Sequence, residues 1–138
     1  MKKIIGNIAI ALAFAFLIYS IVMFMISRKN NTELYIFGYK PYIITTGSME
    51  PTLKIYSFAI VKRGNYENIK ESDIITFTHP GFTQNICHRA IAIDENGITT
   101  KGDNNSVADL PKVTEANYVG KVVFKTNVTS YIANMIKR

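Results

Sequence analysis

IIGNIAIALAFAFLIYSIVMFMI, residues 4–26, is an uncharged run that determines how the N-terminal part of the chain is built. A helix of this length extends about 34 Å, which is enough to cross a hydrocarbon core of about 30 Å. The alternative is a cleaved signal peptide that begins with Lys2 and Lys3. However, the run is longer than the usual apolar core of such peptides, and Arg28-Lys29 follow it where a small-residue cleavage site would be needed. Residues 1–29 are therefore predicted to be a retained membrane anchor.

The formal net charge of +6 is concentrated at the two ends of the 138-residue chain. Residues 1–29 carry four basic side chains and no acid, residues 30–136 carry ten of each sign, and Lys137 and Arg138 supply the remainder. A neutral central region gives no electrostatic footprint for nucleic acid, so no nucleic-acid partner is expected. Basic residues lie on both sides of the apolar run, and the positive-inside rule gives a slight preference for a cytoplasmic N-terminus.

The rest of the chain is rich in β-branched and aromatic residues and is broken by turn signals at 79–82 and 94–97. We expect a linker over 30–41, a β-rich domain over 42–126 and a short tail over 127–138, in which 129–137 allows a short helix. The predicted fold class is mainly β, with one N-terminal transmembrane helix followed by a compact antiparallel, barrel-like sheet. The expected strands are residues 42–46, 55–62, 73–78, 85–93, 98–101 and 119–125.

The single cysteine, Cys87, excludes an internal disulfide framework and a thiolate-rich metal site. It precedes His88 in an apolar strand, and neighbours along a strand point to opposite faces. A Cys–His catalytic pair is therefore disfavoured, and Cys87 is predicted to be a small buried residue. The second histidine, His79, is predicted to be a solvated loop residue beside Pro80.

Two polar stretches have both a structural and a catalytic interpretation. Thr46-Gly47-Ser48-Met49-Glu50-Pro51 follows a predicted strand, and Gly47 would leave the Ser48 hydroxyl accessible, although from spacing alone such a pair is more often a plain turn. Lys101-Gly102-Asp103-Asn104-Asn105, followed by Asp109, is either a tight turn or a calcium loop. The calcium interpretation is disfavoured, because the loop lacks the glycine and the distal glutamate of an EF-hand.

Taken together and in order behind an apolar helix, these stretches resemble one protein family. Gly47-Ser48-Met49-Glu50-Pro51, His88-Arg89, Lys101 to Asn105 and Gly120-Lys121-Val122-Val123 resemble the type I signal peptidases. The match is closer to the endoplasmic-reticulum-type branch, which pairs a serine with a histidine and also occurs in Gram-positive bacteria and archaea. The resemblance extends from about Ile4 to Phe124.

The resemblance implies a membrane-bound serine endopeptidase that removes N-terminal signal peptides from secreted preproteins, with no metal or organic cofactor. Ser48 corresponds to the nucleophile and His88 to the general base. Asp109 is expected to orient the His88 ring, while Asp103 braces the active-site loop. The Ser48 backbone N–H and the Thr46 hydroxyl are the expected oxyanion donors, and the neighbouring residues Gly47 and Met49 are expected to help position substrate.

The same resemblance implies a single-pass protein of the cell membrane with its catalytic domain on the extracytoplasmic face. Its expected partners are preproteins, the lipid bilayer and, as a candidate, the secretion translocon. Apolar residues near Ser48 are expected to be exposed and to contact lipid; they are Met49, Leu53, Ile55 and Phe58. The alternative is a non-catalytic, signal-peptidase-like chaperone or assembly factor for surface pilins, which the joint presence of serine, histidine and both acids disfavours.

Overall fold

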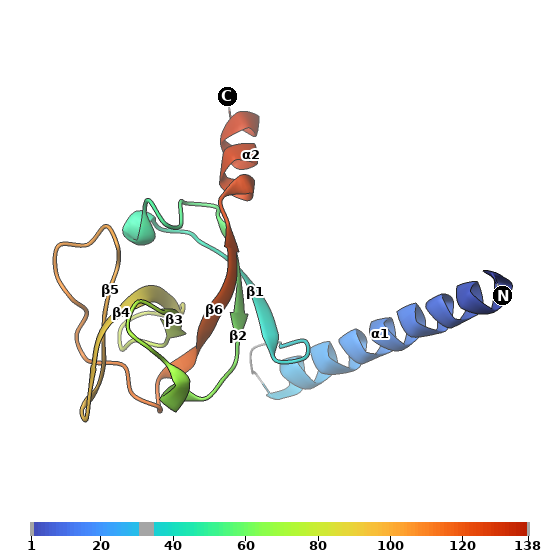
Figure 1. Ribbon diagram of the computed structural model, residues 1–138, viewed down its shortest axis with the longest axis horizontal. Coiled ribbons are helices and arrows are strands. Elements are labelled where there is room, and N and C mark those ends of the chain that lie inside the picture. The colour runs from blue at the N-terminus through green and yellow to red at the C-terminus, as the bar shows by residue number, and fades with distance from the viewer. Residues whose placement is uncertain (1, 31–34, 138) are drawn as a thin grey trace. The chain divides into compact units, whose positions relative to one another are not determined.

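The computed structural model describes residues 2–30 and 35–137 (Figure 1). The predicted linker lies partly outside the described residues, at positions 31–34. The chain divides into two units, Met1–Phe37 and Gly38–Arg138. The candidate functional residues all belong to the second unit.

The first unit contains one long helix among its described residues, α1 (Lys2–Asn30), which extends beyond the predicted 4–26 at both ends. Within it, Lys3–Ile26 is long and apolar enough to cross a membrane, with a mean hydropathy of 2.6 and no part of that window buried. Large apolar side chains such as Leu12 and Phe14 are more than 60% exposed. A helix that belonged to a soluble core would bury one face, so this exposure is consistent with the predicted anchor.

The second unit is a six-stranded sheet whose neighbouring strands are all antiparallel, in the order β1-β2-β6-β3-β4-β5. This arrangement, together with the apolar N-terminal helix, confirms the mainly β fold class. The strands are β1 (Tyr39–Ile43), β2 (Phe58–Lys62), β3 (Ile74–Phe77), β4 (Ile86–Asp94), β5 (Gly97–Lys101) and β6 (Tyr118–Thr126).

The first strand lies three residues earlier than predicted. β1 begins at Tyr39 and contains Pro41, which pairs with Ile60 of β2. A proline inside a strand is tolerated here because β1 is at the edge of the sheet. The expected strand residues 44–46 instead lead out of β1 into a short 3₁₀ helix, η1 (Gly47–Met49).

The last strand of the chain lies in the middle of the sheet. β6 pairs with β2 on one side and with β3 on the other, so the C-terminal end of the domain joins its two halves (Figure 1). Gly120 allows this close packing, because a Cβ there would lie 2.7 Å from the carbonyl oxygen of Lys62. The connection between β2 and β3 contains a second 3₁₀ helix, η2 (Tyr66–Asn68).

Two groups of buried side chains form the core. The first packs β3, β4 and β5 together, and consists of Ile69, Ile75, Phe77, Ala90, Ile98 and Val113. The second lies beneath η1 and consists of Ile44, Met49, Leu53 and Ile74. The expectation of lipid-facing apolar residues is therefore wrong for Met49 and Leu53, which are 1% and 0% exposed. Ile55 is at the surface, and Phe58 is half-buried.

The chain ends in a short helix, α2 (Val128–Ile136), where the sequence allowed a helical segment over 129–137. Asn127, just before it, accepts hydrogen bonds from the Ser57 hydroxyl and from the backbone N–H of Lys54. The side-chain amide of Asn127 also donates to the carbonyl oxygen of Thr52. These bonds attach the segment after η1 to the end of β6, and so help to fix the turn that carries Ser48.

Candidate active site

Ser48 lies in the middle of η1, which is held from below by its neighbour Met49. The Met49 side chain is buried, and its carbonyl oxygen accepts the backbone N–H of Leu53 at 2.9 Å. Because a 3₁₀ turn rotates successive side chains by about 120°, burying Met49 leaves Ser48 on the open side. The hydroxyl oxygen of Thr46, the residue before η1, lies 3.2 Å from the Ser48 Oγ.

His88 is presented by β4, opposite Ile75 of β3. Its residue surface is only 6% exposed, and its ring lies edge-on to Phe77 with a centroid separation of 6.3 Å. These contacts fix the ring, and its Nε2 lies 3.0 Å from the Ser48 Oγ. Burial raises the pKa of the neighbouring Cys87 to about 12, so this thiol is not an activated nucleophile.

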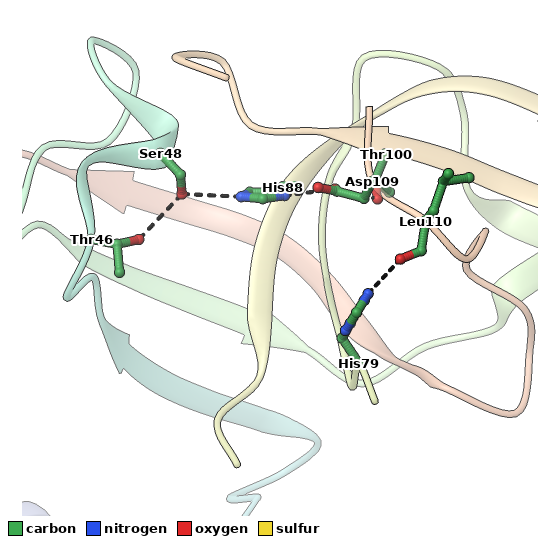
Figure 2. Close-up of polar contacts among 7 residues, drawn as sticks. All are labelled: Thr46, Ser48, His79, His88, Thr100, Asp109 and Leu110. Atoms are coloured by element: carbon green, nitrogen blue, oxygen red, sulfur yellow. Dashed lines mark hydrogen bonds and ion pairs between the residues drawn. The ribbon is translucent and has the colours of Figure 1, made fainter. Parts of the chain in front are cut away.

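Asp109 completes a continuous line of polar contacts behind His88, as Figure 2 shows. The Asp109 Oδ2 lies 2.6 Å from the His88 Nδ1 and accepts the Thr100 hydroxyl at 2.7 Å. The backbone N–H of Asp109 also donates to the Thr100 carbonyl oxygen at 2.8 Å. Thr100, on β5, therefore fixes both the main chain and the carboxylate of Asp109.

The charge on Asp109 determines which nitrogen of His88 carries the proton. Burial alone would raise the pKa of Asp109, but hydrogen bonds from His88 and Thr100 outweigh it and lower that pKa. An ionised carboxylate only accepts, so the Nδ1 of His88 must donate to it. In the neutral ring the Nε2 then has its lone pair directed at the Ser48 hydroxyl, as a general base requires.

Asp103 has a different partner from Asp109. It accepts two hydrogen bonds from Arg89, from Nε at 2.8 Å and from Nη2 at 2.7 Å. These bonds from Arg89 lower the pKa of Asp103 despite the opposing effect of burial. Arg89 also donates to the Ser72 carbonyl oxygen at 2.8 Å, so the pair links the start of β3 to the loop after β5.

The loop after β5 holds the main chain of the serine turn. The backbone N–H of Asn104 donates to the Ser48 carbonyl oxygen at 2.8 Å, and its side-chain amide donates to the Gly47 carbonyl oxygen at 3.2 Å. Gly102 makes this approach possible, because a Cβ there would lie 2.6 Å from the same Ser48 oxygen. Residues 101–105 thus lie against η1 and contact its main chain.

The structure therefore brings Thr46, Ser48, His88 and Asp109 together, and it places Gly47 in the same turn. Met49 belongs to the core beneath this turn, and Asp103 lies on Arg89. The sequence assigned no role to Thr100 or Asn104, because their roles depend on contacts made after the chain has folded.

His79 lies in the loop after β3, as predicted, but it is half-buried and its ring is held by specific contacts. Its Nδ1 lies 2.6 Å from the Pro80 carbonyl oxygen, and its Nε2 lies 2.6 Å from the Leu110 carbonyl oxygen. Its ring also makes an edge-on contact with Phe82, with a centroid separation of 5.3 Å.

An antiparallel sheet that brings a serine, a histidine and an aspartate into hydrogen-bond contact is typical of serine hydrolases. Comparison with known sequences identifies the family within this class. The family model described as "Signal peptidase, peptidase S26" matches residues 1–130, and the chain belongs to this family. It is 32% identical over 120 residues to signal peptidase I W of Bacillus subtilis (strain 168). That match covers 83% of this chain and 63% of the Bacillus protein, so the chain spans less than two thirds of that relative's length.

Proposed function

We propose that the protein is a membrane-anchored serine endopeptidase that cleaves N-terminal signal peptides from secreted preproteins. The observation that carries this proposal is the line from the Ser48 Oγ to the His88 Nε2, at 3.0 Å, and from the His88 Nδ1 to Asp109, at 2.6 Å. Membership of the signal peptidase family supports the substrate class. The use of histidine as the base agrees with the endoplasmic-reticulum-type branch.

In the proposed reaction the Ser48 Oγ attacks the carbonyl carbon of the scissile peptide while its proton passes to the His88 Nε2. The new C–O bond forms, and the carbonyl oxygen becomes an oxyanion. As the intermediate collapses the C–N bond breaks, and the Nε2 proton passes to the leaving amine. Water then attacks the acyl carbon while the His88 Nε2 takes its proton. The C–O bond to Ser48 breaks as this second intermediate collapses, and the Nε2 returns the proton to the Ser48 Oγ. Asp109 stabilises the imidazolium that forms in both halves of the reaction.

Thr46 is well placed to assist the oxyanion. Since the Ser48 hydroxyl directs its only proton at His88, the hydroxyl of Thr46 acts as the donor in their 3.2 Å contact. After attack, the oxyanion is bonded to the carbon that the Ser48 Oγ has joined, close to its original position. The Thr46 hydroxyl and the Ser48 backbone N–H are therefore the proposed oxyanion donors.

Membrane attachment by α1 fits this substrate, because a signal peptide is itself an apolar helix whose cleavage site emerges near the bilayer surface. Tethering both molecules to one surface raises their effective concentration. We place the N-terminus in the cytoplasm and the catalytic domain on the extracytoplasmic face of the cell membrane, where preproteins emerge. The secretion translocon is the corresponding candidate partner. A purely non-catalytic assembly factor is not favoured, since it has no need for the ordered contacts of Ser48, His88 and Asp109.

The test is cleavage of a synthetic preprotein by the purified full chain in detergent micelles, followed by mass spectrometry of the products. Ser48→Ala and His88→Ala are each expected to lower kcat by at least about 10³-fold, because each removes a group that acts only during bond exchange. Ser106→Ala is the matched control, since this exposed serine lies in the loop after β5. Undiminished cleavage by Ser48→Ala would overturn the proposal.

A further inference from the structure

The turn between β3 and β4 carries the second histidine of the chain, which the proposed reaction does not use. Both ring nitrogens of His79 face carbonyl oxygens at 2.6 Å, those of Pro80 and Leu110. Carbonyl oxygens only accept, so the two hydrogen bonds coexist when both ring nitrogens carry hydrogen. In either the protonated ring or one of its neutral tautomers, the Nε2 can donate to Leu110.

His79 is fixed on its own side of this contact. The residue before it, Thr78, donates its backbone N–H to the Asn117 carbonyl oxygen at 2.8 Å and accepts the Asn117 side-chain amide at 3.2 Å. The backbone N–H of Phe82 closes the turn onto the His79 carbonyl oxygen at 3.1 Å. The ring therefore projects from a fixed turn, and its hydrogen bond restrains the Leu110 carbonyl group.

That other end is the residue that follows Asp109. Asp109 is tied to Thr100 through its backbone N–H, and Val113 is tied to Ile98 by two backbone hydrogen bonds of 2.7 and 2.8 Å. Between these two attachments the chain passes through Leu110, whose side chain is 78% exposed and so contributes little packing. Figure 2 shows the His79 ring directed at the Leu110 carbonyl oxygen, with Asp109 next to it and in contact with His88.

We propose that His79 is a positioning residue of the active site, which holds the Leu110 carbonyl and thereby keeps the Asp109 carboxylate directed at the His88 ring. This inference rests on the proposed function, because it assigns His79 a part in the same site. The ring acts through the main chain of Leu110 and does not touch the reacting atoms. The pKa of Asp109 also reflects how close His79 is. Burial raises that pKa, hydrogen bonds lower it, and the charge of His79 lowers it further.

Two substitutions separate the hydrogen bond from the bulk of the ring. His79→Gln places an amide donor near the position of the Nε2, whereas His79→Leu keeps a side chain of comparable size without a donor. Both remove the histidine charge, so the difference between them isolates the bond to Leu110. Gln84→Ala, at an exposed position in the same turn, is the matched control.

Turnover of a synthetic signal peptide by the full chain in micelles is the first measurement. We expect His79→Leu to lower kcat about five- to tenfold with KM unchanged, the range expected for one lost hydrogen bond, while His79→Gln and Gln84→Ala stay within about twofold of the parent. Equal kcat for the leucine and glutamine variants would overturn the proposal. So would a loss confined to KM, since positioning of Asp109 acts on the chemical step.

The second measurement does not depend on activity. With two histidines in the chain, each His79 variant leaves His88 as the only imidazole, so its Nδ1 proton can be followed by NMR without ambiguity. We expect the downfield signal of the proton shared with Asp109 to weaken in His79→Leu and to persist in His79→Gln. If the parent cleaves no preprotein while this signal still distinguishes the variants, the proposed function fails and the positioning role stands. An unchanged signal and unchanged turnover in His79→Leu overturn the positioning role alone.

Discussion

Replacing Gly102 by alanine would place a methyl group 2.6 Å from the carbonyl oxygen of Ser48. Ordinary van der Waals contact begins at about 3.4 Å, so the two segments must separate by about 0.8 Å. The oxygen is part of the backbone and already accepts the Asn104 N–H at 2.8 Å, so it cannot simply rotate away. We therefore expect the main chain of Ser48 to take up part of the displacement.

A displacement of this size matters because the Ser48 Oγ and the His88 Nε2 are now 3.0 Å apart. Moving the serine by about 0.8 Å would take the pair outside good hydrogen-bond geometry, and misplacements of about 1 Å lower rates by about 10²-fold. We therefore expect Gly102→Ala to lower kcat about 100-fold. The same strain should lower the free energy of unfolding by about 1–3 kcal/mol.

The assay is the initial rate of cleavage of a synthetic signal peptide at a temperature where all variants are folded, with the melting temperature measured in parallel. Gly64→Ala is the matched control, because a Cβ at Gly64 meets no atom within 4 Å. It makes the same chemical change in open space and should retain parental kcat. If Gly102→Ala matched Gly64→Ala in kcat, the loop after β5 would not be positioning the nucleophile.

Two further predictions follow from the ionisable groups. The carboxyls of Asp73, Asp103 and Asp109 have a lowered pKa in the folded protein, so their stabilisation is complete above the unfolded value near pH 4 and is lost as the pH falls through the lower folded values. Denaturant titrations should therefore show the free energy of unfolding decreasing below about pH 4, and less steeply for Asp103→Asn; equal slopes would contradict this. Burial raises the pKa of Cys87 to about 12, so iodoacetamide at pH 8 should label it only after unfolding and should leave cleavage unaffected, as mass spectrometry of the intact protein would check. Rapid labelling of the folded chain would show that this strand is open to solvent.

The features that local sequence patterns predict are those that depend on neighbours along the chain. An uncharged run of 23 residues indicates a helix of membrane length whatever its surroundings, and α1 contains that run. β-branched runs predicted the six strands, with the first displaced by three residues because Pro41 is acceptable only at an edge. The central position of β6 has no local signal, since strand pairing across the domain depends on contacts between distant segments.

The prediction that Met49 is exposed was wrong for a definite reason. The prediction that Met49 and Leu53 are exposed treated the residues around Ser48 as apolar surface, but η1 rotates Met49 inward while Ser48 stays accessible. The loop position of His79 was predicted, but its contact with the Leu110 carbonyl oxygen was not, because Leu110 lies 31 residues further along the chain. Ser48 and His88 are 40 residues apart, and their contact was predicted only from the resemblance to a family pattern.

The loop after β5 supports both ends of the proposed catalytic line. Asn104 holds the main chain of Ser48 at one end, and five residues later Asp109 holds the ring of His88 at the other. Thr100 and the Asp103–Arg89 pair fix the loop on the sheet, and His79 fixes it on the β3–β4 turn. Since one segment contacts both the proposed nucleophile, Ser48, and the ring of the proposed base, we expect a disturbance at Gly102 to act first on Ser48 and a disturbance at His79 to act first on Asp109. Variants at the Gly102 end of the loop therefore test the placement of Ser48, whereas variants of His79, which contacts the other end, test the orientation of His88.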